Sequence, residues 1–161
     1  MLEIRKVNGD DLKSVLHIAV KAFTPIHESF RILLGASVFT MVYPNWIESQ
    51  NNYIKELFLD HNKDNFFVVE KDGKIVAFIS LLLEEGKDKA EIGINAVNPD
   101  YSGQGIGMQM YEYAFNYMKS KGIKLVEVST GGDDSHIAAR NTYKKAGFTA
   151  SLPLVKFYKQ L

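Results

Sequence analysis

The sequence predicts an α/β domain of the α+β type, with a mixed central sheet of six to seven strands flanked by helices. Three observations lead to this fold class. Strand-like and helix-like hydrophobic patterns alternate along the second half of the chain, a tight Asp-Gly turn separates two apolar runs, and 46% of the 161 residues are hydrophobic. A chain of this length can bury one core, so we expect residues 1–161 to form a single domain.

The first elements are a strand and a helix. Residues 1–7 alternate apolar and charged side chains, which predicts a strand. Asn8 or Asp10 can cap the helix that follows, because apolar positions then recur every three or four residues as far as Phe23.

Further helices are predicted before residue 60. The first helix is expected to stop near Thr24-Pro25, and a second one to start with Pro25 at its first position and end at Gly35. Pro44 interrupts the aromatic-rich stretch that follows, so another helix is expected from residue 45 to residue 59.

The middle of the chain predicts three strands. Residues 66–70 and 75–83 form a hairpin around Asp72-Gly73, because this pair supplies the positive φ angles of a tight turn. A third strand is expected over 90–97.

The last part of the chain alternates helices and strands. The spacing becomes helical from Ile106, and Gly122 is a plausible C-terminal cap. A strand at 125–130, a helix at 135–146 and a last strand at 149–158 complete the fold, with a proline in the last strand that indicates a bulge or an edge.

Composition excludes several classes of function. With 19 basic and 19 acidic residues the net charge is zero, so we expect neither nucleic acid nor a membrane as partner. The absence of cysteine excludes zinc-thiolate sites and any acyl-cysteine intermediate. The N-terminus lacks signal-peptide features and no apolar run is long enough to span a bilayer, so a cytoplasmic protein is expected.

Three glycines alternate in the loop Tyr101 to Gly107, between a predicted strand and a predicted helix. A strand, a glycine loop and a helix N-terminus together bind phosphate, because free amides converge there and the helix dipole attracts negative charge. An ordinary tight turn is the alternative. The spacing does not fit the dinucleotide fingerprint, and no Gly-Lys-Ser or Gly-Lys-Thr indicates a P-loop.

Residues 102–107 resemble the acyl-CoA loop of the GNAT superfamily of N-acyltransferases, whose signature is Gln or Arg, two variable residues, Gly, one variable residue, then Gly or Ala. Ser102 stands where Gln or Arg is usual. A second block, residues 139–148, resembles the family's later helix, with Tyr143 shortly before a Gly-Phe pair. A usual Asn before this helix is replaced by His136, and the resemblance extends over residues 65–158.

The resemblance implies direct acetyl transfer from acetyl-CoA to a primary amine of a small molecule or protein, without a metal. It implies Glu91 as the catalytic base, with a solvated strand glutamate as the alternative. It implies Tyr143 as the group beside the thiol, with a core tyrosine as the alternative, and the Val97 amide as an oxyanion donor. The implied acetyl-CoA-binding residues are Ala96, Val97, Ser102, Gly103, Gln104, Gly105, Ile106, Gly107 and Asn141. For Asn141 the alternative is a position on the solvated face of its helix.

The acceptor is not identified by the sequence. Six aromatic residues in the predicted N-terminal helices either line an acceptor pocket or form core or a dimer face: Phe30, Phe39, Tyr43, Trp46, Tyr53 and Phe58. Asp133 or Asp134 is expected to cap a helix rather than bind metal. A homodimer is left open, and so are two other functions: a non-catalytic acyl-CoA sensor and a phosphate-binding or structural domain.

Overall fold

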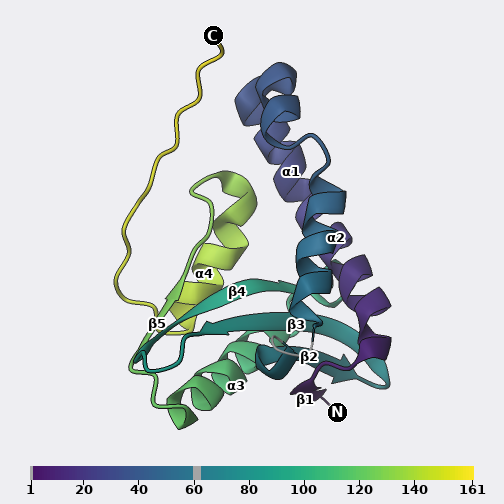
Figure 1. Cartoon of the computed structure of the whole chain (residues 1–161), viewed down its shortest axis with the longest axis vertical. Coiled ribbons are helices and arrows are strands. Elements are labelled where there is room, and N and C mark those ends of the chain that lie inside the picture. Colours follow the sequence, from purple (N-terminus) through teal and green to yellow (C-terminus); the bar gives the residue numbers. More distant parts are fainter. Residues whose placement is uncertain (1, 60–62) are drawn as a thin grey trace.

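The computed structural model describes residues 2–59 and 63–161, and this part of the chain contains five strands and four helices (Figure 1). In chain order they are β1 (Leu2–Lys6), α1 (Leu12–Val42), α2 (Trp46–Leu57), β2 (Phe66–Lys71), β3 (Lys74–Leu83), β4 (Lys89–Val97), α3 (Ile106–Ser120), β5 (Leu125–Val128) and α4 (Ile137–Lys145). Short 3-10 turns precede α1, β2 and α4, and another follows β4.

The strands form one mixed sheet in the order β1-β2-β3-β4-β5. Strands β1 to β4 are antiparallel neighbours, and β5 runs parallel to β4. The predicted fold class is confirmed, but in the described residues the sheet has five strands rather than six to seven. The parallel pair places the loops that follow β4 and β5 at the same end of the sheet.

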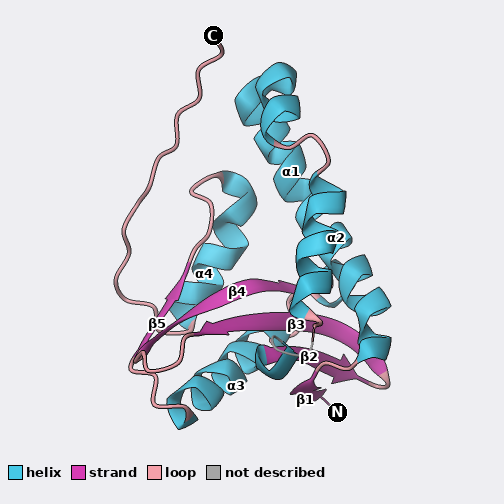
Figure 2. Cartoon of the chain, in the orientation of Figure 1, coloured by secondary structure: helices cyan, strands magenta, loops and turns pink. Residues whose placement is uncertain are grey.

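Helices cover both faces of this sheet (Figure 2). On one face, Met110 and Met118 of α3 are buried in a cluster that also contains Ile92 of β4. On the other face, Ile18 of α1 and Ile54 of α2 belong to a second cluster. Strand β3 lies between the two layers with six consecutive buried residues, which explains its continuous apolar sequence.

The hairpin between β2 and β3 follows its turn residues. Asp72 has φ 51° and Gly73 has φ 75°, as a tight two-residue turn requires. Lys71 pairs with Lys74 across this turn. The predicted hairpin is confirmed.

Helix α1 contradicts the predicted break at Thr24-Pro25, because it continues through Pro25. A proline inside a helix removes one hydrogen bond and costs about 3 kcal/mol. The Thr24 hydroxyl donates to the Val20 carbonyl at 2.7 Å, and buried apolar residues earlier in the helix hold it against the sheet. The predicted break at Gly35 is confirmed, since this residue has φ 74° and ψ 156° within the helical span.

The C-terminal segment contradicts the strand predicted over 149–158. Residues 149–161 form no regular structure and extend away from the sheet toward the far end of α1 (Figure 1). The Gln160 side-chain amide donates to the Ser37 hydroxyl at 2.8 Å. Leu154 and Phe157 are 85% and 89% exposed. The segment is thus extended, but a strand also needs a neighbouring strand to pair with its backbone amides and carbonyls.

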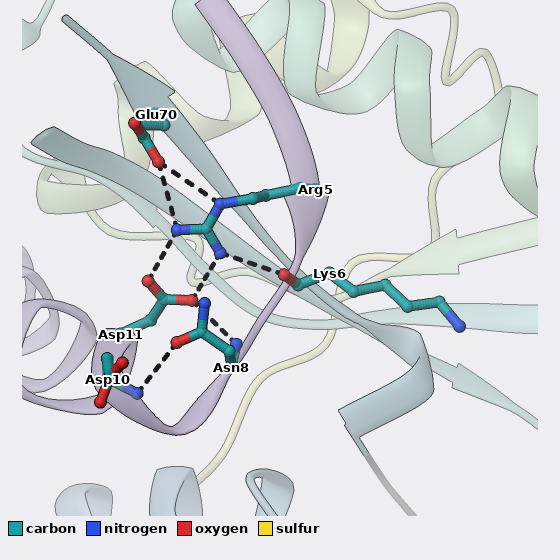
Figure 3. A network of polar contacts seen from close by, with 6 residues as sticks. All are labelled: Arg5, Lys6, Asn8, Asp10, Asp11 and Glu70. Carbon is teal, nitrogen blue, oxygen red and sulfur yellow. Dashed lines mark hydrogen bonds and ion pairs between the residues drawn. The ribbon is translucent and has the colours of Figure 1, made fainter. Parts of the chain in front are cut away.

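A polar network joins β1, β2 and the start of α1 (Figure 3). The Arg5 guanidinium donates to Asp11 at 2.7 and 2.8 Å and to Glu70 at 3.2 and 3.3 Å. Burial raises the pKa of Asp11, but hydrogen bonds from Arg5 and the Asn8 amide outweigh it, so this pKa lies below its ordinary value. Asn8 caps the turn before α1, as predicted, by accepting from the Asp10 amide at 2.9 Å.

Candidate active site

The site begins where β4 and β5 part. Their pairing ends at Ile92 and Val128, while β4 continues to Val97. Strand β4 contains a β-bulge just before Asn95, where it has one residue more than the facing part of β3. Before the bulge Ile92 packs in the cluster on the α3 face of the sheet, and after it Ala96 packs in the cluster on the opposite face. A bulge of this kind increases the local twist. The last part of β4 therefore presents a backbone edge that β5 does not cover.

The direction of the amides on this edge follows from the pairing with β3. Val97 lies opposite Ala77, and the Asn98 amide donates to the Val76 carbonyl at 2.8 Å. Successive amides of a strand point to opposite sides. The Val97 amide therefore points away from β3, toward the side on which β5 has separated.

The glycine loop connects this edge to α3. Gly103 and Gly105 both have φ 75°, a left-handed conformation that glycine adopts without strain. Ile106 is 2% exposed and anchors the first turn of α3 in the core. The Gln109 amide donates to the Gly105 carbonyl at 3.2 Å and forms the first hydrogen bond of the helix. The amides just before Gln109 therefore have no helical carbonyl to donate to. The loop therefore has the backbone geometry of an anion-binding helix N-terminus.

A cation next to this loop was not predicted from the sequence. Lys71, at the end of β2, donates to the Gln104 side-chain oxygen at 2.6 Å, and its ammonium lies 5.9 Å from the centre of the Tyr101 ring. Lys71 is 33 residues away from Gln104 in the chain, so no local motif indicates this pairing.

Helix α4 meets the loop and the edge of β4. A Cβ atom built on Gly107 would lie 3.7 Å from the Val97 side chain and 3.9 Å from the Thr142 side chain. Gly107 is thus the position at which three predicted parts of the site meet: the end of β4, the start of α3 and helix α4. Predicted Asn141 is exposed beside Thr142, while Ser102, Gly103 and Gln104 are exposed in the loop.

Tyr143 of α4 is half-buried and belongs to a polar chain that runs to the bulge. Its ring centre lies 5.6 Å from that of Tyr111 on α3. Tyr111 donates its hydroxyl to the Asn95 side-chain oxygen at 2.7 Å, and the Asn95 amide donates to the Gly93 carbonyl at 3.0 Å. Burial, and secondarily the Tyr143 phenol, raises the pKa of Tyr111 above its ordinary value. Tyr111 was not among the predicted residues.

Glu91 is half-buried on β4, two residues before Gly93. It pairs in register with Leu82 of β3 and Glu127 of β5. Burial raises the pKa of Tyr53 on α2, and the charges of Glu91 and Glu56 add to this effect. The negative charge of Glu91 therefore lies within electrostatic range of the Tyr53 phenol on α2.

The loop after β5 is held to α1 by Asp133. This carboxylate accepts from the Ser29 hydroxyl at 2.9 Å and from the Ser135 amide at 3.2 Å, and contacts His136 Nδ1 at 2.7 Å. Burial raises the pKa of Asp133, but the hydrogen bonds from Ser135, His136 and Ser29 dominate and lower it to about 2. Asp133 caps the turn before α4, as predicted for Asp133 or Asp134.

Five of the six predicted aromatic residues separate into two groups, and the sixth, Tyr53 on α2, is 41% exposed. Phe30, Tyr43 and Trp46 line one cavity, and Phe39 joins them through a ring contact of 5.5 Å with Tyr43. Phe58 instead packs against Phe66 in the core.

Neither a metal-binding cluster nor a membrane-spanning helix occurs in the part of the chain that the structure describes. Residues 2–59 and 63–161 contain no group of three His, Asp or Glu side chains arranged to hold a metal ion. Within the same residues, no helix combines the length and the hydropathy needed to cross a bilayer.

Comparison with known proteins places this geometry in a family. The model of the acetyltransferase (GNAT) family matches residues 33–148. An uncharacterized N-acetyltransferase of Methanocaldococcus jannaschii is 31% identical over 90% of the chain, which spans 59% of that relative's length. An uncharacterized N-acetyltransferase of Archaeoglobus fulgidus is 28% identical over 95% of the chain and 92% of its own length.

A solved structure supports the fold. PaiA N-acetyltransferase from Thermoplasma acidophilum, in complex with coenzyme A, superposes with a TM-score of 0.66 at 21% identity, over 94% of this chain and 91% of its own. The family match covers well over half of the sequence. The chain therefore belongs to the acetyltransferase (GNAT) family.

Proposed function

We propose that this protein transfers an acetyl group directly from acetyl-CoA to a primary amine of a small molecule or a protein. One observation carries the proposal: β4 parts from β5 after Ile92 and leads, with an uncovered backbone edge, into the glycine loop at the start of α3. The family match and the coenzyme A bound to the solved relative support acetyl-CoA as the donor. The non-catalytic sensor considered above is not favoured, because the sequence relatives are named as N-acetyltransferases.

The donor half of the site follows from backbone geometry. Free amides from Gly103 to Gly107 bind the pyrophosphate of acetyl-CoA, and the α3 dipole favours its negative charge. Ser102 occupies the position where the family usually has Gln or Arg, so binding depends mainly on main-chain donors. Ala96 and Val97 present the uncovered edge of β4 to the pantetheine arm, with Asn141 at the rim.

The acceptor half needs a base, an oxyanion donor and an acid. An alkyl amine with an ordinary pKa near 10.4 is free base only about one part in a thousand at neutral pH, so Glu91 accepts its proton. The Val97 amide stabilises the oxyanion, because it points toward the uncovered side of β4. Tyr143 donates a proton or a hydrogen bond to the departing thiolate.

The experiment that tests donor binding is calorimetric titration with acetyl-CoA, with NAD and ATP as competitors. Gly105→Asp should weaken acetyl-CoA binding at least about tenfold, because it strains a left-handed position and places a carboxylate where phosphate binds. Gly86→Asp is the matched control: Gly86 also has φ 74° and open space around it, but lies in the β3–β4 turn. Equal affinities of the two variants, or no selectivity over NAD and ATP, would contradict the proposal.

A further inference from the structure

A cavity of about 400 Å³ lies between α1, the turn before α2 and the 3-10 turn before α4. Phe30, Tyr43 and Trp46 line it, together with His27 and His136. The His27 ring centre lies 4.0 Å from that of Trp46, and Phe30 stacks on His136 at 5.7 Å. Among the described residues that line it there is no Asp, Glu, Lys or Arg. The walls are therefore aromatic and aliphatic, with Ser49 and Gln50 among them, and the Asp133 carboxylate lies behind the wall residue His136, whose Nδ1 it contacts at 2.7 Å.

Two buried polar atoms in these walls have no hydrogen-bond partner within the described structure: His27 Nδ1 and the side-chain nitrogen of Gln50. Leaving such an atom unsatisfied costs about 1–3 kcal/mol, so native proteins rarely bury one without a reason. Burial lowers the pKa of His27, so its ring is neutral at neutral pH. Both atoms are covered from the cavity in this structure, so an uncharged ligand oxygen bonds to them once the His27 ring or the Gln50 amide turns toward the cavity.

Two lining residues relate the cavity to the elements of the proposed acetyl-transfer site. Phe23 lines it and also packs in the cluster that contains Ile94 and Ala96 on the last part of β4. His136, on the opposite wall, directly precedes α4, which carries Tyr143. Among the described residues, none that lines the cavity belongs to β4, so an acceptor has to extend past Phe23 to reach that strand.

We propose that this cavity selects the acceptor: a primary amine attached through a short chain to a neutral aromatic ring that bears an oxygen, as in the hydroxyphenylalkylamines. This inference rests on the proposed acetyl transfer. The ring packs against Tyr43 and Trp46, its oxygen bonds to Gln50 and His27, and the amine extends toward β4. A cavity of this size accommodates a ring and a short chain. Polyamines and aminoglycosides are disfavoured, because several ammonium groups would be desolvated without a carboxylate in the walls.

Binding can be measured without turnover, because Trp46 is the single tryptophan of the chain and lies in the cavity wall. Tyramine, added to the protein in the presence of free CoA, should give a saturable change in tryptophan fluorescence. Butylamine and spermidine at the same concentrations should give none. An identical response to all three amines, or no response to tyramine, would overturn the inference.

Specificity for the oxygen is tested with Gln50→Leu, which keeps a similar volume and removes the polar nitrogen. Tyramine and phenethylamine differ only in the ring hydroxyl, so the ratio of their kcat/KM values isolates its interaction. This ratio should be about 3- to 10-fold in the natural protein and at least about twofold lower in Gln50→Leu, where only His27 can still bond to the hydroxyl. The control is Asn52→Leu, an exposed position on the same helix, which should keep the natural ratio.

The outcomes separate this inference from the function on which it rests. Acetylation of butylamine as fast as tyramine, with a ratio near one in the natural protein, overturns the aromatic selectivity and leaves acetyl transfer intact. A saturable tyramine signal that Gln50→Leu weakens, without acetylation of any amine, supports the ligand class and overturns acetyl transfer.

Discussion

Replacing Asp133 by asparagine removes a negative charge that Ser29, Ser135 and His136 surround. The Asp133 and His136 side chains are only 13% and 12% exposed, so solvent screens their interaction weakly. Ser29 belongs to α1 and lies 104 residues before Asp133 in the chain. The carboxylate therefore fastens α1 to the segment before α4, next to the aromatic cavity.

The size of the effect follows from the pKa of Asp133. A decrease from 3.8 in the unfolded chain to about 2 in the folded protein corresponds to about 2 kcal/mol, at 1.36 kcal/mol per pH unit. Because the folded-state pKa is the lower one, this stability is present above about pH 4 and is lost as the pH falls toward 2. At pH 3 roughly half of it, about 1 kcal/mol, remains.

Urea unfolding at pH 5 and pH 3 measures this contribution, because carboxylates rather than histidines titrate in that range. The free energy of unfolding of Asp133→Asn should be about 2 kcal/mol lower than that of the natural protein at pH 5, and this difference should shrink by about half at pH 3. Asp134→Asn, at the exposed neighbouring position, serves as the control. A gap that does not change with pH, or one below about 0.5 kcal/mol at pH 5, would refute the reasoning.

Three further predictions concern the site and the C-terminus. Glu91→Gln should lower kcat/KM by about 100-fold, most strongly at low pH where the amine is most protonated; an unchanged pH profile would remove Glu91 as the base. Tyr111→Phe should lower the free energy of unfolding by about 1–2 kcal/mol and reduce kcat more than it changes the KM for acetyl-CoA, whereas Tyr113→Phe on the same helix should do neither. Amides of residues 149–158 should exchange rapidly with deuterium, and protection there would show that this segment pairs with a sheet edge in solution.

Much of the donor half of the site could be predicted from the sequence, because its geometry is local. Glycines at 103 and 105 permit the left-handed angles of the loop, and the helical spacing from Ile106 sets the start of α3. The Asp72-Gly73 turn likewise fixed the hairpin, since its two residues determine their own angles. The roles of Glu91 and Tyr143 stay predictions.

The tertiary structure decided whatever depends on partners distant in the sequence. Pro25 resembled a helix start, but packing along α1 offsets the lost hydrogen bond and the helix continues. Residues 149–158 have a strand-like pattern, but strand formation requires a neighbour that the pattern cannot supply.

The aromatic cavity and the side-chain contacts of the site also depend on partners that are distant in the sequence. Sequence alone determined the fold class, the glycine loop and the presence of aromatic residues near the N-terminus. Only folding brought Ser29 to Asp133, Tyr111 to Asn95 and Lys71 to Gln104. Backbone angles are set by neighbouring residues, whereas these contacts depend on how helices pack across the sheet, which no short segment encodes.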